Sequence, residues 1–452
     1  MSHDEIKTEA IKVLCGEYQK YNDIAPELYE RFDIKRGLRN QDGTGVLAGV
    51  TGICNVHGYL INEGEKEPIE GELIYRGINI KEIIQGCQKQ QRFGFEETAY
   101  LLIFGVLPTK SQLEYFQTLM CLFRELPDNF FEDMILKAPS NNIMNKLARS
   151  VLALYSYDHQ AEDSSLEMEI SKSLRLISRL SHIMVKAYQV KKSHFDGGSM
   201  ILHPLLEGQS IAESILSLLR PDRQFTKEEA LLLDTCMMLH AEHGGGNNST
   251  FTCRVLTSSG TDAYSAYAGA IGSLKGPKHG GANIKVIQML EQIKSHVHNW
   301  EDEEEIAAFL RQIINRQAGD RSGLIYGMGH AVYTKSDPRA KILKESAITL
   351  AKNTEFEPEF RLLEAVEKLT PMIFAQLKGT DKPICANVDL YSGLVYKMLG
   401  IPEDLFTPLF ACSRMAGWSA HRMEEMTSSG KIIRPAYKAV SKVRGYIPLE
   451  ER

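Results

Sequence analysis

The sequence lacks several patterns that would place it in a broad class at once. Its eight cysteines form no CxxC pair, which gives no support to a zinc ribbon or a disulfide framework. Scattered single cysteines in a long chain are typical of reduced residues in a cytosolic protein. No stretch has the length and apolarity of a membrane span. The first 24 residues have neither the apolar run of a signal peptide nor the Arg-rich composition of a transit peptide. We therefore expect a cytoplasmic protein with no membrane partner.

An excess of basic residues is absent too. The chain carries 52 Lys and Arg against 58 Asp and Glu, a net charge of −6. A nucleic-acid surface needs clustered Lys and Arg, so we expect no nucleic-acid partner, although a local basic site would still bind a small phosphate ligand. The 452 residues, 43% of them hydrophobic, are too many for one compact core. This length predicts two domains, or one large domain with an insertion.

The hydrophobic periodicity is mainly that of helices. Residues Phe95–Phe104 place apolar side chains on one stripe, and Gly105 ends the stretch. The segment Glu303–Arg316 begins with acids and ends with Arg, as the helix dipole favours. A strand pattern occurs only near the start, at residues 49–56 and 73–75, and predicts a small hairpin or sheet. The predicted fold class is mainly α with a small N-terminal β element.

Histidines and glycines are concentrated in the segment from Leu239 to Ser249. His240 and His243 are three residues apart, and three glycines follow them. One interpretation is a metal site, because His residues at i and i+3 share a helix face, but the segment does not match HExxH and offers no third ligand. A glycine-rich helix C-cap is a second interpretation, and a histidine presented to a ligand at a helix end is a third.

His279 lies in the run Gly276–Asn283, just before a predicted helix. The partial positive charge at a helix N-terminus disfavours the imidazolium form. A neutral imidazole can donate a hydrogen bond to a developing oxyanion, as the neutral histidine of triosephosphate isomerase does. Glycines on both sides would let a substrate approach the backbone closely.

A second glycine-flanked histidine, His330, follows Gly327 and Gly329. The segment fails the GxGxxG pattern at Val332 and the P-loop pattern at Thr334. The backbone of the Gly-x-Gly turn could still bind a phosphate beside Lys335.

Asp389 ends an apolar stretch and opens a predicted helix, so taken alone it resembles a helix N-cap. Arg339, Arg414 and Arg434 are spread over the last quarter of the chain. Together these residues suit carbanion chemistry on a multiply charged acid. Arginines bind carboxylates bidentately, a carboxylate removes a proton from carbon, and neutral donors stabilise the enolate.

With these motifs in order, the sequence resembles the citrate synthase family over roughly residues 45 to 452. The resemblance rests on GELIYRG from Gly71, HAEHGGGNNSTFT from His240, GPKHGGAN from Gly276, GMGHAVYTKSDPR from Gly327, ANVDLYSG from Ala386 and KIIRP from Lys431. The first ~40 residues match poorly, and we assign them no role.

The resemblance implies a two-domain helical fold in which a small domain interrupts a large one. Residues 1–280 and 401–452 would form the large domain, and residues 281–400 the small one. The family works as a homodimer with its site in the cleft between domains. Closure of that cleft around oxaloacetate would exclude water and protect a reactive enolate.

The resemblance also implies roles for individual residues. Asp389 would remove a proton from the methyl group of acetyl-CoA, His279 would stabilise the enolate, and His330 would polarise the keto carbonyl of oxaloacetate. Four further residues would bind oxaloacetate: His243, Arg339, Arg414 and, from the partner subunit, Arg434. A helix N-terminus would stabilise the Asp389 anion and so weaken it as a base.

The implied activity is an acyltransferase reaction in which the acyl group becomes alkyl on transfer. Acetyl-CoA, oxaloacetate and water give citrate and CoA through citryl-CoA. The coenzyme A thioester is a co-substrate, with Gly327, Gly329 and Lys335 as candidate contacts, and we expect no permanently bound cofactor and no metal. Two alternatives are 2-methylcitrate synthase, which would use propionyl-CoA, and a non-catalytic helical scaffold. A metal hydrolase built on His240 and His243 is a third alternative.

Overall fold

A computed structural model describes residues 3–40, 43–62, 65–379, 383–428 and 430–452. The chain divides into two compact units. The first combines residues 1–50 with residues 434–452, and the second spans Thr51–Ile433. The first unit contains α1 (His3–Tyr21), α2 (Glu27–Arg31) and two short 3₁₀ turns, η1 (Arg36–Leu38) and η5 (Leu449–Glu451).

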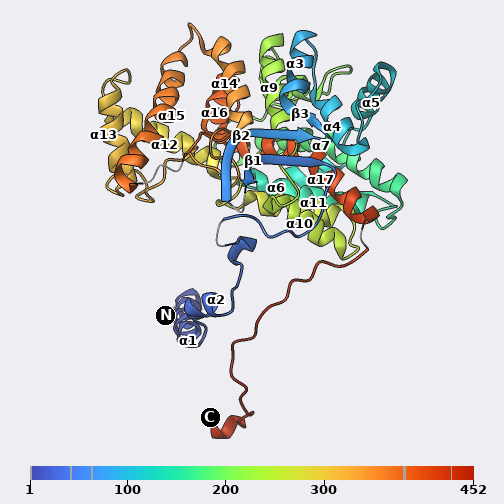
Figure 1. The fold of residues 1–452 in the computed structure, drawn as a ribbon. Helices are drawn as coiled ribbons and strands as arrows, with labels where there is room; N and C mark the ends of the chain where they lie inside the picture. Colours follow the sequence, from blue (N-terminus) through green and yellow to red (C-terminus); the bar gives the residue numbers. More distant parts are fainter. Residues whose placement is uncertain (1–2, 41–42, 63–64, 380–382, 429) are drawn as a thin grey trace. The chain divides into compact units, whose positions relative to one another are not determined.

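The second unit is mainly helical, as predicted (Figure 1). Its α-helices are α3 (Ile80–Lys89), α4 (Phe95–Phe104), α5 (Lys110–Leu122), α6 (Ile143–Leu154), α7 (Leu166–His194), α8 (Ile211–Leu219), α9 (Lys227–His240), α10 (Asn248–Ser258), α11 (Ala263–Lys275), α12 (Ala282–His296), α13 (Glu303–Ile314), α14 (Pro338–Ala351), α15 (Glu357–Lys378), α16 (Asp389–Met398) and α17 (Phe406–Ser428). A π-helix, η2 (Phe131–Leu136), and the 3₁₀ turns η3 (Tyr155–Tyr157) and η4 (Glu403–Leu405) join them.

The helix boundaries follow local sequence signals. Gly105 ends α4 in the left-handed conformation, with φ of 82°. Capping boxes begin α5 at Thr109, α8 at Ser210 and α9 at Thr226. In each box the hydroxyl accepts from a backbone N–H three residues on, and that residue's side chain accepts from the backbone N–H of the cap.

The predicted β element is a three-stranded antiparallel sheet in the order β1-β2-β3. Its strands are β1 (Cys54–Asn62), β2 (Glu65–Tyr75) and β3 (Ile78–Asn79). Cys54 pairs with Tyr75, and the register shifts between His57 and Tyr59. The prediction of a hairpin is confirmed, but residues 49–53 lie outside it and the strands extend further toward the turn than the sequence pattern indicated.

The centre of the second unit is α17, which packs against α4, α6, α7, α9, α10 and α11. Its side chains include the fully buried Trp418, Arg414 and Arg422. Helices α12 to α16, yellow to orange in Figure 1, pack among themselves, and α14 also contacts α9 and β2. These helices cover the stretch 281–400 predicted as a small domain, and that division stays a prediction.

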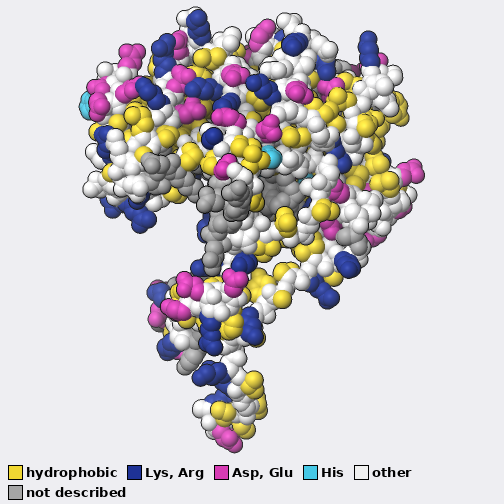
Figure 2. All heavy atoms as spheres, in the orientation of Figure 1, with side chains coloured by type: hydrophobic (Ala, Val, Ile, Leu, Met, Phe, Trp, Pro, Cys, Tyr) yellow, Lys and Arg dark blue, Asp and Glu magenta, His cyan; other side chains and the backbone are white. Residues whose placement is uncertain are grey.

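Acidic and basic side chains are interspersed on the face drawn in Figure 2. No helix among the described residues is both long and apolar enough to cross a membrane.

Candidate active site

The rings of His243, His330 and Tyr333 lie close together. His243 is in the turn after α9, and His330 and Tyr333 are in the loop before α14. The ring of His243 lies edge-on to that of His330, with centroids 5.1 Å apart. Tyr333 stacks on His330 at 4.7 Å. The Nδ1 atom of His330 accepts hydrogen bonds from the backbone N–H groups of Val332 and Tyr333, at 3.0 and 3.1 Å. Because Nδ1 accepts, the ring proton lies on Nε2, which makes Nε2 a hydrogen-bond donor.

The sheet holds the His330 loop in place. Tyr333 donates its hydroxyl proton to the carbonyl of Glu72, and the N–H of Gly71 donates to Ser336 Oγ at 3.1 Å. The loop approaches the strands so closely that a Cβ at Gly58 would lie 2.8 Å from the Val332 carbonyl oxygen. A Cβ at Gly71 would collide with the carbonyl oxygen of Ser336. Glycine is required at both positions for this contact.

Gly71→Ala should therefore displace the His330 loop and lower kcat/KM by about 10²-fold, because a shift of about 1 Å in a reacting group has an effect of that size. Gly86→Ala in α3 is the matched control, since nothing lies within 4 Å of its added Cβ. The control should keep full activity and unfold at the same or a slightly higher temperature. A kinetic assay and thermal unfolding measure the two effects, and near-normal kcat/KM in Gly71→Ala would contradict this role for the sheet.

Asp389 is the first residue of α16, but its carboxylate does not cap the helix. The N-cap position is Val388, and the Asp389 N–H donates to Asn387 Oδ1 at 3.0 Å. The interpretation of Asp389 as an N-cap is therefore wrong. Asn387 provides the hydrogen bond that the helix terminus needs, which leaves the Asp389 carboxylate available to a substrate.

The pKa of Asp389 also differs from expectation. Burial raises it from 3.8 to about 6, with Arg339 lowering it and Asp337 raising it. The prediction that the helix N-terminus weakens Asp389 as a base is wrong in sign, because loss of hydration outweighs the dipole. A carboxylate with this pKa is a stronger base that is still ionised at neutral pH.

His279 occupies a turn just before α12, as predicted. The backbone N–H of Ser249, in α10, points at its Nε2 at 3.4 Å, and the Ser249 hydroxyl lies 3.1 Å from the same atom. Burial, with a contribution from the charge of Arg414, lowers the pKa of His279 to about 4. The ring is therefore neutral at physiological pH, and acceptance at Nε2 places its proton on Nδ1.

Arg414 is a fully buried guanidinium on α17 with unused hydrogen-bonding capacity. Its Nε donates to the His240 carbonyl at 2.6 Å, and its Cζ lies 4.7 Å from the centre of the Phe410 ring. Nη1 and Nη2 are buried and have no hydrogen-bond partner among the described residues. A buried charge without partners is unfavourable by several kcal/mol, so this position suits an anionic ligand.

Arg339 differs from Arg414 because it is already paired. It lies in the first turn of α14, where Nε and Nη2 donate to the carboxylate of Asp337 at 3.0 and 2.7 Å. Burial alone would lower the pKa of Arg339, but the charge of Asp337 raises it. Two of its three guanidinium nitrogens are thus already bound to Asp337, and its role as a carboxylate ligand stays a prediction.

Pairwise electrostatic interactions link six of the predicted residues. Burial and the charges of Arg339, His330 and Arg414 hold the pKa of His243 well below its usual range. Arg414 also acts on His279, and Arg339 acts on Asp389. Nε2 of His243 is buried with no hydrogen-bond partner among the described residues. A cluster of neutral imidazoles and cationic guanidinium groups is suited to an acid with an electrophilic carbonyl.

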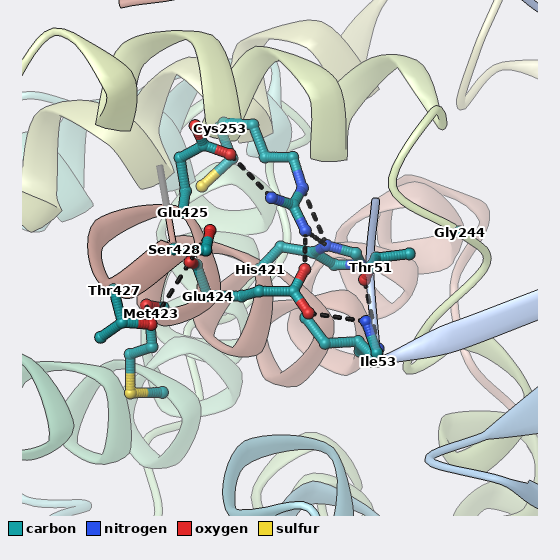
Figure 3. Close-up of polar contacts among 12 residues, drawn as sticks. Thr51, Ile53, Gly244, Cys253, His421, Met423, Glu424, Glu425, Thr427 and Ser428 are labelled. Carbon is teal, nitrogen blue, oxygen red and sulfur yellow. Dashed lines mark hydrogen bonds and ion pairs between the residues drawn. The ribbon is translucent and has the colours of Figure 1, made fainter. Parts of the chain in front are cut away.

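Sequence reasoning missed a buried chain of charges behind His243. The carboxylate of Glu242 accepts from the Gly244 N–H and, at 3.0 Å, from Nε2 of His421. Nδ1 of His421 accepts from Nε of Arg254 at 3.0 Å, so the His421 proton lies on the side of Glu242. Figure 3 shows His421 with Glu424 and Glu425, which form ion pairs with Arg254.

This chain fixes the turn that carries His243. Burial alone would raise the pKa of Glu242, but His421 and Arg414 hold it below its usual value. Gly417 on α17 faces the same turn, and a Cβ there would collide with Glu242 Oε2. Glu242 lies within the HAEHG motif, but His421 is 179 residues away and has no local signal of this role.

The glycine-rich stretch after α9 does not cap that helix. The C-cap residue is Ala241, in the right-handed conformation, and Gly244 turns the chain with φ of 87°. His240 is buried against Phe410, with ring centroids 4.4 Å apart. No group of three or more His, Cys, Asp or Glu among the residues that the structure describes could hold a metal ion.

The three residues predicted to contact coenzyme A differ in their exposure and hydrogen bonding. Gly327 and Gly329 adopt positive φ of 82° and 90°, and the Gly329 N–H donates to the Cys385 carbonyl at 2.7 Å. That N–H is engaged within the chain, so it does not offer the phosphate hydrogen bond that the sequence suggested. Lys335 is exposed. Contacts of these residues with coenzyme A stay a prediction. So does the role of Arg434, which belongs to the first unit.

Comparison with known proteins identifies the family of this chain. The family model described as "Citrate synthase, C-terminal domain" matches residues 41–436. This chain belongs to the citrate synthase family. A citrate synthase from Synechocystis sp. is 34% identical over 85% of this chain and 89% of its own length. A 2-methylcitrate synthase from Shewanella oneidensis is 32% identical over 84% of this chain and 92% of its own.

Solved structures of the citrate synthase family share the fold. One is the ternary complex of citrate synthase from the archaeon Thermoplasma acidophilum with carboxymethyl coenzyme A and oxaloacetate. Its TM-score is 0.74 at 28% identity, and the match covers 93% of this chain and 99% of that one. The predicted mainly α citrate synthase fold is confirmed.

Proposed function

We propose that this member of the family condenses acetyl-CoA with oxaloacetate and water to give citrate and CoA. The observation that carries the proposal is that the Nη atoms of Arg414 are buried without a partner among the described residues, while its charge acts on His243, whose ring contacts that of His330. A dicarboxylate with a keto group matches it, because Arg414 can bind a carboxylate while Nε2–H of His330 donates to the keto oxygen. Arg339 and His243 are further ligands of oxaloacetate, and Arg434 of the partner subunit completes the set in a homodimer.

Asp389 then removes a proton from the methyl group of the acetyl thioester. Negative charge develops on the thioester oxygen, and Nδ1–H of His279 donates to it. The enolate carbon attacks the keto carbon of oxaloacetate, and the new alkoxide takes the proton of His330. Water cleaves the thioester of the citryl-CoA product, which releases citrate and CoA. The thioester is a co-substrate, with Lys335, Gly327 and Gly329 near its phosphates, and the reaction belongs in the cytoplasm.

The pH profile should identify Asp389 as the base. Its pKa of about 6 means that kcat/KM for the thioester should rise tenfold per pH unit below that value and level off above it. The value of kcat/KM rises with pH because the reaction needs the ionised carboxylate, which predominates above the pKa. His279, with a pKa of about 4, stays neutral through this range. An acid limb centred near 4 would contradict the raised pKa of Asp389.

The deciding assay is thiol release from acetyl-CoA and from propionyl-CoA in the presence of oxaloacetate. We expect a higher kcat/KM with acetyl-CoA. One extra methylene in a pocket changes kcat/KM by about 10- to 200-fold, so the two substrates are well separated by this measurement. A higher value with propionyl-CoA would establish 2-methylcitrate synthase. Failure with every short acyl-CoA would favour a non-catalytic scaffold, and loss of activity on chelation would favour a metal enzyme.

A further inference from the structure

The turn that follows α9 carries His243, and its conformation depends on a carboxylate that the proposed reaction does not use. Oε1 of Glu242 accepts the N–H of Gly244 and lies 3.0 Å from Nε2 of His421. The backbone of Glu242 is bonded separately to the hydroxyl of Tyr75. Glu242 and His421 are fully buried, so water cannot replace either partner if the other is lost. His421 therefore helps to determine how this turn is arranged.

His421 can donate to Glu242 in only one tautomer, and Arg254 on α10 selects that tautomer. Nε and Nη2 of Arg254 lie 3.0 and 2.7 Å from Nδ1 of His421. Arginine has hydrogen-bond donors and no acceptor, so Nδ1 accepts and the ring proton lies on Nε2. The imidazole is thus a donor whose direction is fixed toward Oε1 of Glu242.

Two carboxylates of α17, the helix that carries His421, hold Arg254 in this position. Nη1 of Arg254 donates to Oε2 of Glu425 at 2.7 Å, and Nη2 forms an ion pair with Glu424 (Figure 3). All three guanidinium nitrogens are therefore bonded, either to these acids or to His421. A planar group with every nitrogen engaged has little freedom to turn away from the imidazole.

The direction of the His243 imidazole depends on the turn. Its Nε2 is buried and has no hydrogen-bond partner among the described residues. Its ring lies edge-on to those of His330 and Tyr333, with centroids 5.1 and 5.6 Å away. In the proposed function this nitrogen binds the keto acid, so the affinity should follow the geometry of the turn.

Glu242 also acts on a second proposed ligand of oxaloacetate. Burial lowers the pKa of Arg414, and the charge of Glu242 opposes that effect. Nε of Arg414 donates to the carbonyl of His240, which lies in the same segment of the chain as Glu242. Displacement of Glu242 would therefore disturb two proposed ligands of oxaloacetate at once.

We propose that His421 is a positioning residue for the keto acid. It orients Glu242, and Glu242 in turn holds the turn that carries His243. The inference rests on the proposed function, because it takes oxaloacetate as the ligand of His243. The backbone N–H of Asp389, the proposed base, is bonded to Asn387 and not to this chain of side chains. We therefore expect His421 to affect the affinity for oxaloacetate and to have little effect on kcat.

Two amide variants separate the two hydrogen bonds of His421. In His421→Gln the terminal amide can replace Nε2–H as the donor to Glu242, whereas the shorter amide of His421→Asn replaces only the acceptor for Arg254. His421→Asn should raise the dissociation constant of oxaloacetate by about tenfold or more, as when a residue that orients a ligating side chain is lost. His421→Gln should raise it by about threefold or less, because the bond to Glu242 is kept.

Isothermal titration with oxaloacetate gives the dissociation constants, and thiol release from acetyl-CoA at saturating oxaloacetate gives kcat. The kcat of both variants should stay within about threefold of the parent value, since only binding is affected. His182→Asn is the matched control, because His182 on α7 is also a buried histidine and its Nδ1 contacts the carbonyl of Arg124. It should unfold at a lower temperature and bind oxaloacetate as the parent does.

Arg254→Lys carries the test if His421→Asn does not fold. Lysine keeps a positive charge beside Glu424 and Glu425, but a single ammonium group cannot bond both acids and the imidazole in the geometry of a guanidinium. This variant should raise the dissociation constant of oxaloacetate by about threefold to tenfold. Binding as tight as in the parent would then contradict the role of His421.

The outcomes for this inference and for the proposed function are distinct. An unchanged dissociation constant in His421→Asn, or equal weakening in His421→Asn and His421→Gln, would overturn the inference while oxaloacetate still bound to the parent. Absence of oxaloacetate binding by the parent protein would overturn the proposed function, and this inference with it.

Discussion

Replacement of Asp389 by asparagine should lower kcat by about 10²- to 10⁴-fold and leave oxaloacetate binding nearly intact. The range is that of a lost general base. Asparagine keeps the shape of the side chain, and the cap of α16 is unaffected because Asn387 supplies it. In the proposed site, oxaloacetate is bound by arginines and histidines and not by Asp389, so its dissociation constant should change little.

Asp128→Asn is the matched control, since Asp128 is exposed and the chemical change is identical. It should retain full kcat. Stopped-flow thiol release gives kcat, and titration with oxaloacetate alone gives the dissociation constant. If Asp389→Asn turned over at a near-normal rate, another group would have to remove the proton.

Arg414→Met should abolish tight oxaloacetate binding and at the same time stabilise the free protein. Loss of the carboxylate ligand should weaken binding by about 2–5 kcal/mol, which is about 30-fold or more. Methionine removes a buried charge whose Nη atoms have no hydrogen-bond partner among the described residues. It also removes a cation that acts on Glu242, which His421 still pairs, so the rise in the free energy of unfolding should be small, about 1 kcal/mol. Binding and stability would thus change in opposite directions.

Arg422 on the same helix gives the matched comparison. It is also buried, but its Nε and Nη2 donate to Glu169 at 2.7 and 3.0 Å. Arg422→Met should lower the free energy of unfolding by about 3 kcal/mol, because Glu169 would lose its main partner. Thermal unfolding with and without oxaloacetate separates the cases. Oxaloacetate should raise the Tm of Arg422→Met but not that of Arg414→Met. Equal destabilisation of both variants would make Arg414 a structural residue.

Local patterns predicted the helical framework well. The bounds of α4 agree with the periodicity from Phe95 to Phe104, because Gly105 offers a left-handed C-cap that few other residues adopt readily. The start of α13 agrees for a similar reason, as Asp302 accepts from the N–H groups of Glu304 and Glu305. Such signals act over a few residues and need no knowledge of the tertiary structure.

The properties of the candidate site were harder to predict from the sequence. The pKa of Asp389 depends on burial by distant segments, so a local dipole argument gave the wrong direction. The chain from Arg254 through His421 to Glu242 joins α10, α17 and the turn after α9. No local periodicity encodes that pairing. The lack of a hydrogen-bond partner at the Nη atoms of Arg414, among the described residues, is likewise a result of packing. The arginine itself was identified from the sequence.

One amide side chain joins two of the proposed reacting groups. Asn387 accepts from the Asp389 N–H, and its Nδ2 donates to the carbonyl of Gly329, the neighbour of His330, at 2.9 Å. Its own N–H donates to the Gly327 carbonyl. His279, in contrast, contacts Ser249 on α10. These hydrogen bonds connect the segment that carries Asp389 with the segment that carries His330. A substitution at Asn387 should therefore disturb the proposed base and the proposed donor to the keto carbonyl together.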